Sequence, residues 1–322
     1  MAGRTGSGET AAGTRWARSA VGNGAAALSV CAMAMGPSIL KSIDMPELSF
    51  LLWRLLFAVP FYGLLLLVAR QRVGWTDLRR SARGGLAFGV HMLLLVVAFR
   101  RTSATNAVLI ISLQPVVMLV AGARLFGERP HRSVYGWGLA AFVGVVLTVL
   151  ASEGGGVATR EGDLLAVLLM LSFVAFMVVS KQARGQVDSS PYQLAVTLMA
   201  AAMVLPVVLL VEGGVVLPTG SDWGLVVAMA FLGGSGYLLL TVANGYTSLT
   251  MVSLISLGYM GVVPLFAWWL VGEAVGGAQV VGIVVVLVAL CIVVTRSVEV
   301  VSPPAAQDSV AGDPTPDVPA AG

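Results

Sequence analysis

The sequence has little charge. Only 11% of its 322 residues are Asp, Glu, Lys or Arg, whereas 57% are hydrophobic. A soluble globular domain carries about 25% charged residues, so polar groups cannot cover this surface and much of it must face lipid. The few charges form short clusters between long apolar runs, which is typical of a chain that crosses a membrane several times.

Other features are scarce as well. The two cysteines, Cys31 and Cys291, lie within apolar runs and are too few for a disulfide framework or a metal site, so we expect no metal and no cofactor. No Gly-x-x-x-x-Gly-Lys phosphate loop occurs, which leaves ATP-driven chemistry without support. No basic segment with interleaved aromatics predicts a nucleic-acid partner. The expected partners are a lipid bilayer and a small molecule, with a homodimer left open.

Apolar segments of membrane-spanning length fill the chain. A spanning helix needs about 20 apolar residues, and the pattern predicts an all-α integral membrane protein with ten transmembrane helices. The predicted spans are 21–40, 48–69, 84–99, 102–126, 133–151, 162–180, 191–211, 222–243, 246–271 and 274–295. Residues 1–20 and 296–322, rich in small residues and proline, are expected to be disordered.

The basic residues predict the orientation of these spans. With the N-terminus inside, cytoplasmic segments hold 14 Lys and Arg residues and outer segments hold 4. Because cytoplasmic loops carry the excess of positive charge, we expect a multi-pass protein of the inner (plasma) membrane with both termini in the cytoplasm.

The chain also matches itself after a shift of 145 residues. Residues 102–128 and 247–273 share nine identities in 27 positions, and Gly127-Glu128 falls on Gly272-Glu273. Each half, 21–151 and 162–295, then holds five helices. Five is odd, so the second half starts on the opposite side of the membrane and the two repeats are inverted. Inverted repeats around a site near the midplane are a common transporter architecture.

Several local patterns together resemble a known family. They are the run 102–107 (Thr-Ser-Ala-Thr-Asn-Ala), the following Pro115, Phe126-Gly127-Glu128, the run 162–166 (Gly-Asp-Leu-Leu-Ala), Ser190-Pro191 and Val271-Gly272-Glu273. The sequence resembles the drug/metabolite transporter superfamily, specifically its EamA-like branch with two EamA repeats. The resemblance implies ten helices around a central cavity lined by spans one, three, four, six, eight and nine, and it implies metabolite efflux without ATP. No enzymatic activity is expected.

Two titratable residues within spans are candidates for the substrate pathway. Arg54 lies about two turns inside the second span, and a charge in the membrane is a functional candidate by default. It could bind a substrate carboxylate, or it could reach outward or pair with Glu47. His91 is central in the third span and could relay protons, bind substrate or pack as a hydrogen-bonded residue.

Polar residues on the fourth and ninth spans complete the predicted pathway. Polar groups in lipid need partners, so these side chains are expected to face a cavity or another helix. They are Asn106, Gln114, Ser253, Ser256 and Tyr259.

A second set is expected to be structural. Gly127 and Gly272 permit the left-handed turn that ends a helix, and Glu128 and Glu273 then lie near the N-terminus of the following helix, where negative charge is favoured. Pro115 and Pro264 are expected to kink their helices.

Two other functional classes are weighed against a carrier. Ser235, in the run 233–236 (Gly-Gly-Ser-Gly), with His91 as a base, would suit an intramembrane serine protease. A channel would need rings of like residues from several subunits. No acidic residue lies at the centre of a predicted span, so proton coupling through a central carboxylate has no support.

Overall fold

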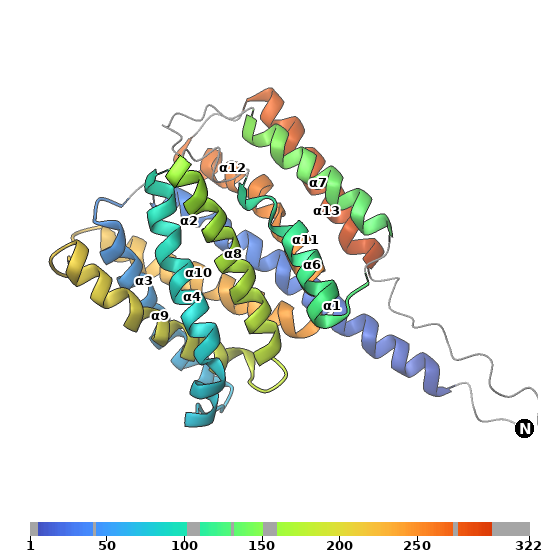
Figure 1. The fold of residues 1–322 in the computed structure, drawn as a ribbon, viewed down its shortest axis with the longest axis horizontal. Helices are drawn as coiled ribbons and strands as arrows, with labels where there is room; N and C mark the ends of the chain where they lie inside the picture. Colours follow the sequence, from blue (N-terminus) through green and yellow to red (C-terminus); the bar gives the residue numbers. More distant parts are fainter. Residues whose placement is uncertain are drawn as a thin grey trace, which may run out of the picture.

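The computed structural model describes residues 6–40, 43–101, 110–129, 132–150, 160–272 and 276–297. Throughout these ranges the regular elements are helices (Figure 1). The first helix begins at Gly6, so the segment before residue 20, expected to be disordered, is largely helical. Residues 298–322 of the expected tail lie outside the described ranges.

The helices follow one another with short connections. Those of the first half are α1 (Gly6–Ala34), α2 (Gly36–Leu40), α3 (Glu47–Val68), α4 (Trp75–Arg101), α6 (Gln114–Phe126) and α7 (Arg132–Leu150). Those of the second half are α8 (Arg160–Ala183), α9 (Ser189–Val211), α10 (Asp222–Tyr246), α11 (Leu249–Ser256), α12 (Gly258–Val271) and α13 (Gly277–Ser297).

Seven stretches of the described chain are long and apolar enough to cross a membrane. They are Arg18–Ile39, Glu47–Val68, Trp75–Ala98, Arg160–Ala183, Ser189–Val211, Asp222–Tyr246 and Leu249–Leu270. Three shorter apolar helices, Gln114–Phe126, Arg132–Leu147 and Gly277–Ile292, fall within further predicted spans. Many large apolar side chains point outward, with Leu67 77% and Leu210 84% exposed, as expected of a surface that faces lipid.

The two halves of the chain interleave in space. Helix α4 packs against α8 and α9, α1 packs against α10, and α3 packs against α9 and α10. Helices α7 and α13 form a separate pair, drawn in green and red in Figure 1. Each of these contacts joins one half to the other, so a cavity at the centre has walls from both.

The internal repeat is visible in the backbone. Gly127 and Gly272, 145 residues apart, end α6 and α12 with positive φ values of 63° and 72°. The predicted ninth span is broken at Leu257, between α11 and α12. The chain also turns at residues 112–113, before α6 begins, which is the equivalent place in the first repeat.

Candidate functional site

A buried arginine lies at the centre of the helix bundle. Arg54, on α3, is only 7% exposed. Its Nη2 donates to the Met92 sulfur at 3.4 Å, and its guanidinium carbon lies 5.9 Å from the centre of the Tyr237 ring. Within the described ranges no carboxylate forms an ion pair with Arg54, Glu47 included. The arginine therefore does not reach the surface, and no carboxylate of the described residues neutralises it.

Arg54 forms part of the wall of a small, narrow cavity. The other lining residues are Leu55, Ala58, Tyr62, Phe88, Thr197, Ala230, Gly233, Gly234 and Tyr237. They come from α3, α4, α9 and α10, which are the second, third, seventh and eighth predicted spans. The third and eighth belong to the set implied by the family resemblance, and the second and seventh do not. The cavity measures about 10 Å³, and a single water needs at least about 10–15 Å³. A solute larger than water enters only after the helices separate.

Glycine allows α10 to approach α3 closely at this point. The Tyr62 hydroxyl donates to the Gly234 carbonyl at 2.7 Å. A β-carbon added at Gly234 would lie 3.3 Å from the same hydroxyl, and one added at Gly233 would lie 3.6 Å from Arg54 Nε. The two glycines thus place no side chain against Arg54, whereas Tyr237, one turn further along α10, contacts the guanidinium.

Aromatic rings enclose the arginine from several helices. Phe88 packs edge-on against Tyr237 with ring centres 4.7 Å apart, and Phe176 lies behind Phe88 at 4.9 Å. Tyr259, from α12, is close enough to interact electrostatically with Arg54 and Tyr237. The site therefore combines one cation with phenol groups and apolar ring faces.

His91 is buried beside this cavity, with its Nδ1 3.3 Å from the Ser172 hydroxyl. Ser172 gives its own proton to the Leu169 carbonyl at 2.7 Å, so the histidine Nδ1–H must be the donor and Nε2 the acceptor. Ser235 donates to the Leu232 carbonyl at 3.0 Å. No hydrogen bond joins His91 to Ser235, and the serine–histidine pair that a protease requires is not assembled.

The remaining predicted pathway residues have varied surroundings. Gln114, at the start of α6, is 7% exposed. The Ser253 and Ser256 hydroxyls each donate to a carbonyl of their own turn, at 2.8 Å, and so satisfy themselves locally. Asn106 lies outside the described residues.

The two prolines assigned structural roles differ from each other. Pro264 lies inside α12, whereas Pro115 sits at the first positions of α6 and does not interrupt a helix there. A proline fits at a helix start because its missing N–H would have no partner in the first turn. The expectation of a kink at Pro115 is corrected accordingly.

At one end of the bundle a carboxylate joins the two repeats. Glu128, which follows α6, accepts hydrogen bonds from the backbone N–H groups of Leu249 and Thr250 at 2.7 and 3.0 Å and from the Thr250 hydroxyl at 2.9 Å. Lys181 Nζ lies 3.4 Å from the same carboxylate and donates to the Thr247 carbonyl at 2.7 Å. Glu128 therefore caps α11 of the other repeat, not the next helix in the chain as expected. Its equivalent, Glu273, lies outside the described residues.

The opposite end is closed by the same chemistry. Glu212, at the end of α9, accepts from the backbone N–H groups of Leu48 and Ser49, both at 3.0 Å, and from the Ser49 hydroxyl at 2.5 Å. Val216 belongs to the same hydrogen-bond network, since its N–H donates to Ser49 Oγ and its carbonyl accepts from Trp53 Nε1. Helix α9 is 23 residues long, or about 34 Å, so the Glu212 end and the Glu128 end lie a membrane thickness apart.

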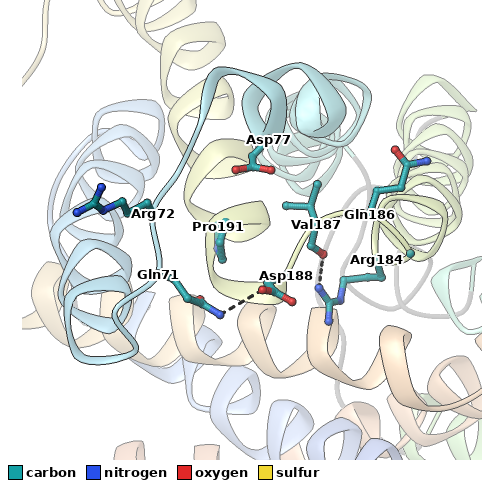
Figure 2. Close-up of a pocket in the computed structure, with 9 residues that line it drawn as sticks. Gln71, Arg72, Asp77, Arg184, Gln186, Val187, Asp188 and Pro191 are labelled. Atoms are coloured by element: carbon teal, nitrogen blue, oxygen red, sulfur yellow. Dashed lines mark hydrogen bonds between the residues drawn. The ribbon is translucent and has the colours of Figure 1, made fainter.

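A second, larger pocket opens near the turn between α8 and α9, where α8 carries Lys181. It measures about 390 Å³ and is lined by Gln71, Arg72, Asp77, Arg184, Gly185, Gln186, Val187, Asp188 and Pro191. Figure 2 shows the Gln71 amide bonded to Asp188, at 3.3 Å, and Arg184 bonded to the Val187 carbonyl. Burial lowers the pKa of the Arg184 guanidinium, and the nearby Asp188 carboxylate opposes that shift.

Buried polar groups connect this pocket to the central cavity. Tyr192 follows the pocket residue Pro191, and Gln193 comes next, accepting from the Thr241 hydroxyl at 2.9 Å. Gln193 and Thr197 both lie beside the Tyr62 hydroxyl of the cavity. The hydroxyl of Tyr192 and the Nε2 of Gln193 are buried without a hydrogen-bond partner among the described residues. Polar side chains of α9 thus lie between the pocket and the cavity, on the buried side of the helix.

The comparisons with known proteins agree with this architecture. The profile of the EamA-like transporter family matches residues 20–150 and 160–295. The chain belongs to the EamA-like transporter family. Both EamA repeats are present, and they coincide with the two halves that the 145-residue shift defines.

Relatives of this EamA chain extend the comparison. It is 24% identical over 216 residues to the pseudopaline exporter CntI of Pseudomonas aeruginosa, in both strains UCBPP-PA14 and PAO1, covering 66% of this chain and 73% of that protein. A protein of known crystal structure superimposes with a TM-score of 0.70 at 18% identity, covering 87% of this chain and 98% of the other. At that identity the likeness shows the fold alone.

Sequence reasoning missed Tyr62, Tyr237 and Glu212. The repeat carries a signal for Tyr237, because it lies 145 residues after Met92 and both residues contact Arg54. Glu212 is the single acid at the end of a long apolar run, followed by Gly213-Gly214. That position is typical of a chain turning at the membrane surface, and nothing local indicates that α3 is its partner.

Proposed function

We propose that this EamA-family protein is a secondary transporter that exports small metabolites by alternating access between two inverted five-helix repeats. The observation that carries the proposal is the narrow cavity around Arg54, between the two repeats. Its walls come from α3 and α4 of one repeat and from α9 and α10 of the other. Only relative movement of the repeats would open it.

The contacts of Glu128 with α11 and of Glu212 with α3, which we call the two seals, support this mechanism. Glu128 ties the first repeat to the start of α11, and Glu212 ties the second repeat to the start of α3. With both intact, the arrangement corresponds to an occluded carrier. Breaking one while keeping the other exposes the cavity to one side of the membrane, which is the requirement for alternating access.

Three short helices complete ten spans when they are counted with the seven longer ones. On that count the repeats are inverted and both termini are cytoplasmic, as the basic residues favour. The 390 Å³ pocket and the Glu128 seal then face the cytoplasm, and the Glu212 seal faces outward. Export as the direction rests on the likeness to the pseudopaline exporter.

A channel is a weaker candidate because the cavity around Arg54 holds about one water, which is too little for a continuous pore. A protease is weaker still, since Ser235 and His91 bond elsewhere.

Transport by the purified protein in liposomes tests the proposal. Vesicles are loaded with a panel of labelled metabolites, and efflux is followed with and without a pH gradient. The matched control is Ser235→Ala, which leaves the cavity lining intact. We expect saturable efflux that Ser235→Ala preserves and that excess unlabelled solute on the opposite side accelerates by exchange. Non-saturable leakage without exchange would contradict a carrier.

A further inference from the structure

Arg54 stands apart from the other partly or fully buried basic residues of the described chain. Lys181 has the Glu128 carboxylate at 3.4 Å, and Asp188 stabilises the charge of Arg184. Among the described residues Arg54 has the Met92 thioether and the neutral phenol of Tyr237, whose ring and hydroxyl lie beside the guanidinium. These contacts are weak compensation for removing a guanidinium from water. A purely structural arginine at this depth is expected to have an acidic partner, so the missing anion points to a ligand.

The residues around Arg54 suit such a ligand once the helices have separated, since the cavity as it stands holds no more than about one water. The guanidinium lines the cavity, and Gly233 and Gly234 of α10 present no side chain toward it. A guanidinium offers a planar fork of N–H donors, which matches the two oxygens of a carboxylate. Tyr62 and Tyr237 add phenol groups to the same lining.

The other residues that line the cavity indicate the chemistry of the uncharged part of the ligand. Phe88, Leu55, Ala58 and Ala230 are apolar, and none of the described residues that line the cavity is a carboxylate. A substrate whose main charge is positive finds no counter-charge here and meets Arg54 instead. An apolar body on a single carboxylate satisfies both the ring faces and the arginine.

The placement also suits a transported group. Met92 and Tyr237, the two residues in contact with Arg54, occupy equivalent positions of the two repeats, 145 residues apart. An anion held by Arg54 therefore lies where the repeats meet, and either opening exposes it.

Resting on the transport function proposed above, we infer that the substrate of this carrier bears a carboxylate, bound by the Arg54 guanidinium, on a small apolar body. Arg54 is the specificity-determining residue, and the aromatic lining receives the apolar part.

Matched probe pairs test this inference. N-acetyl-L-leucine and N-acetyl-L-phenylalanine each differ from their carboxamides by the anionic group alone. The thermal unfolding midpoint of the purified full-length protein is measured with each probe, for the wild type, Arg54→Gln, Arg54→Lys and the control Arg101→Gln. Arg101 is an exposed arginine that pairs with Glu161.

We expect at least one carboxylate to raise the midpoint more than its carboxamide does, in the wild type and in Arg101→Gln. In Arg54→Gln the apparent Kd for that carboxylate should rise about 10- to 100-fold, with Arg54→Lys intermediate. Without ligand, Arg54→Gln should unfold at the wild-type temperature or above it, because it removes an unpaired buried charge. A structural arginine would give a lower midpoint.

Three outcomes overturn the inference: no carboxylate preference in either pair, an equal preference in Arg54→Gln, or a lower ligand-free midpoint in that variant. Transport in liposomes separates this failure from failure of the proposed function. If carboxamides cross the bilayer and carboxylates do not, the proposed transport function stands and the inference of a carboxylate substrate is refuted. If carboxylates bind in an Arg54-dependent way but never cross the bilayer, the binding site stands and the proposed transport function is refuted.

Discussion

Replacing Glu128 with glutamine should make one end of the helix bundle open more readily. The carboxylate is only 11% exposed and accepts three hydrogen bonds from the start of α11, in addition to its ion pair with Lys181. Glutamine keeps the size, but one oxygen becomes an NH₂ group that faces a donor. At least one bond to the charged group is lost, and such bonds contribute about 1.5–3 kcal/mol each. A loss of about 2 kcal/mol shifts the balance toward the open state about 30-fold.

Cysteine accessibility measures this shift. Ser253, one turn inside α11 and 1% exposed, is changed to cysteine in a background without Cys31 and Cys291. The rate of reaction with a membrane-impermeant maleimide, applied from the Glu128 side, is then compared with and without Glu128→Gln. We expect the rate to rise by up to about 30-fold, and Glu161→Gln, which alters an exposed carboxylate, to leave it unchanged. Equal rates with and without Glu128→Gln would show that this carboxylate does not hold the end closed.

Other substitutions address the opposite seal, the packing and the pathway. Glu212→Gln should increase labelling only from the other side of the membrane, and labelling from the Glu128 side instead would refute the assignment of two separate seals. Gly144→Ala should lower the free energy of unfolding by about 1–3 kcal/mol, because the new β-carbon would lie 2.9 Å from a backbone nitrogen of α13. Gly136→Ala is the control and should not lower it, since nothing lies within 4 Å of its β-carbon. Equal thermal midpoints for the two variants would contradict the close α7–α13 contact. His91→Ala and Gln114→Ala should each reduce liposome transport while membrane insertion, judged by yield in the membrane fraction, stays normal. Full transport in both would remove these residues from the pathway.

The sequence predicts the helical membrane class, the EamA family and the two halves because these depend on composition and on chain-wide repetition. A lone arginine in an apolar span is also visible without a structure, which is why Arg54 is a candidate from the start. The aromatic residues around it are not visible in this way. Tyr62 and Tyr237 occur among many apolar residues, and tyrosine in a membrane protein more often marks the interface.

Sequence reasoning assigns the wrong hydrogen-bond partner where the actual partner is distant in the chain. Local spacing assigns Glu128 to the next helix, since a carboxylate near a helix N-terminus is favourable. The structure satisfies the same preference with α11, 121 residues away. The lining of the cavity is anticipated only in part for a related reason: which faces of α3, α4, α9 and α10 converge depends on the packing of one half against the other.

The equivalence of the two seals bears on how the carrier cycles. Each uses one carboxylate, two consecutive backbone N–H groups and one hydroxyl, and each carboxylate belongs to the repeat opposite the helix that it caps. Seals of the same chemistry have similar strengths, so neither end opens at a much lower free-energy cost than the other. The ion pair with Lys181 adds to the Glu128 side alone. In the proposed alternating-access cycle, a difference of that size would bias the protein toward one opening without preventing the other, and a substrate bound at Arg54 would be able to reverse the bias.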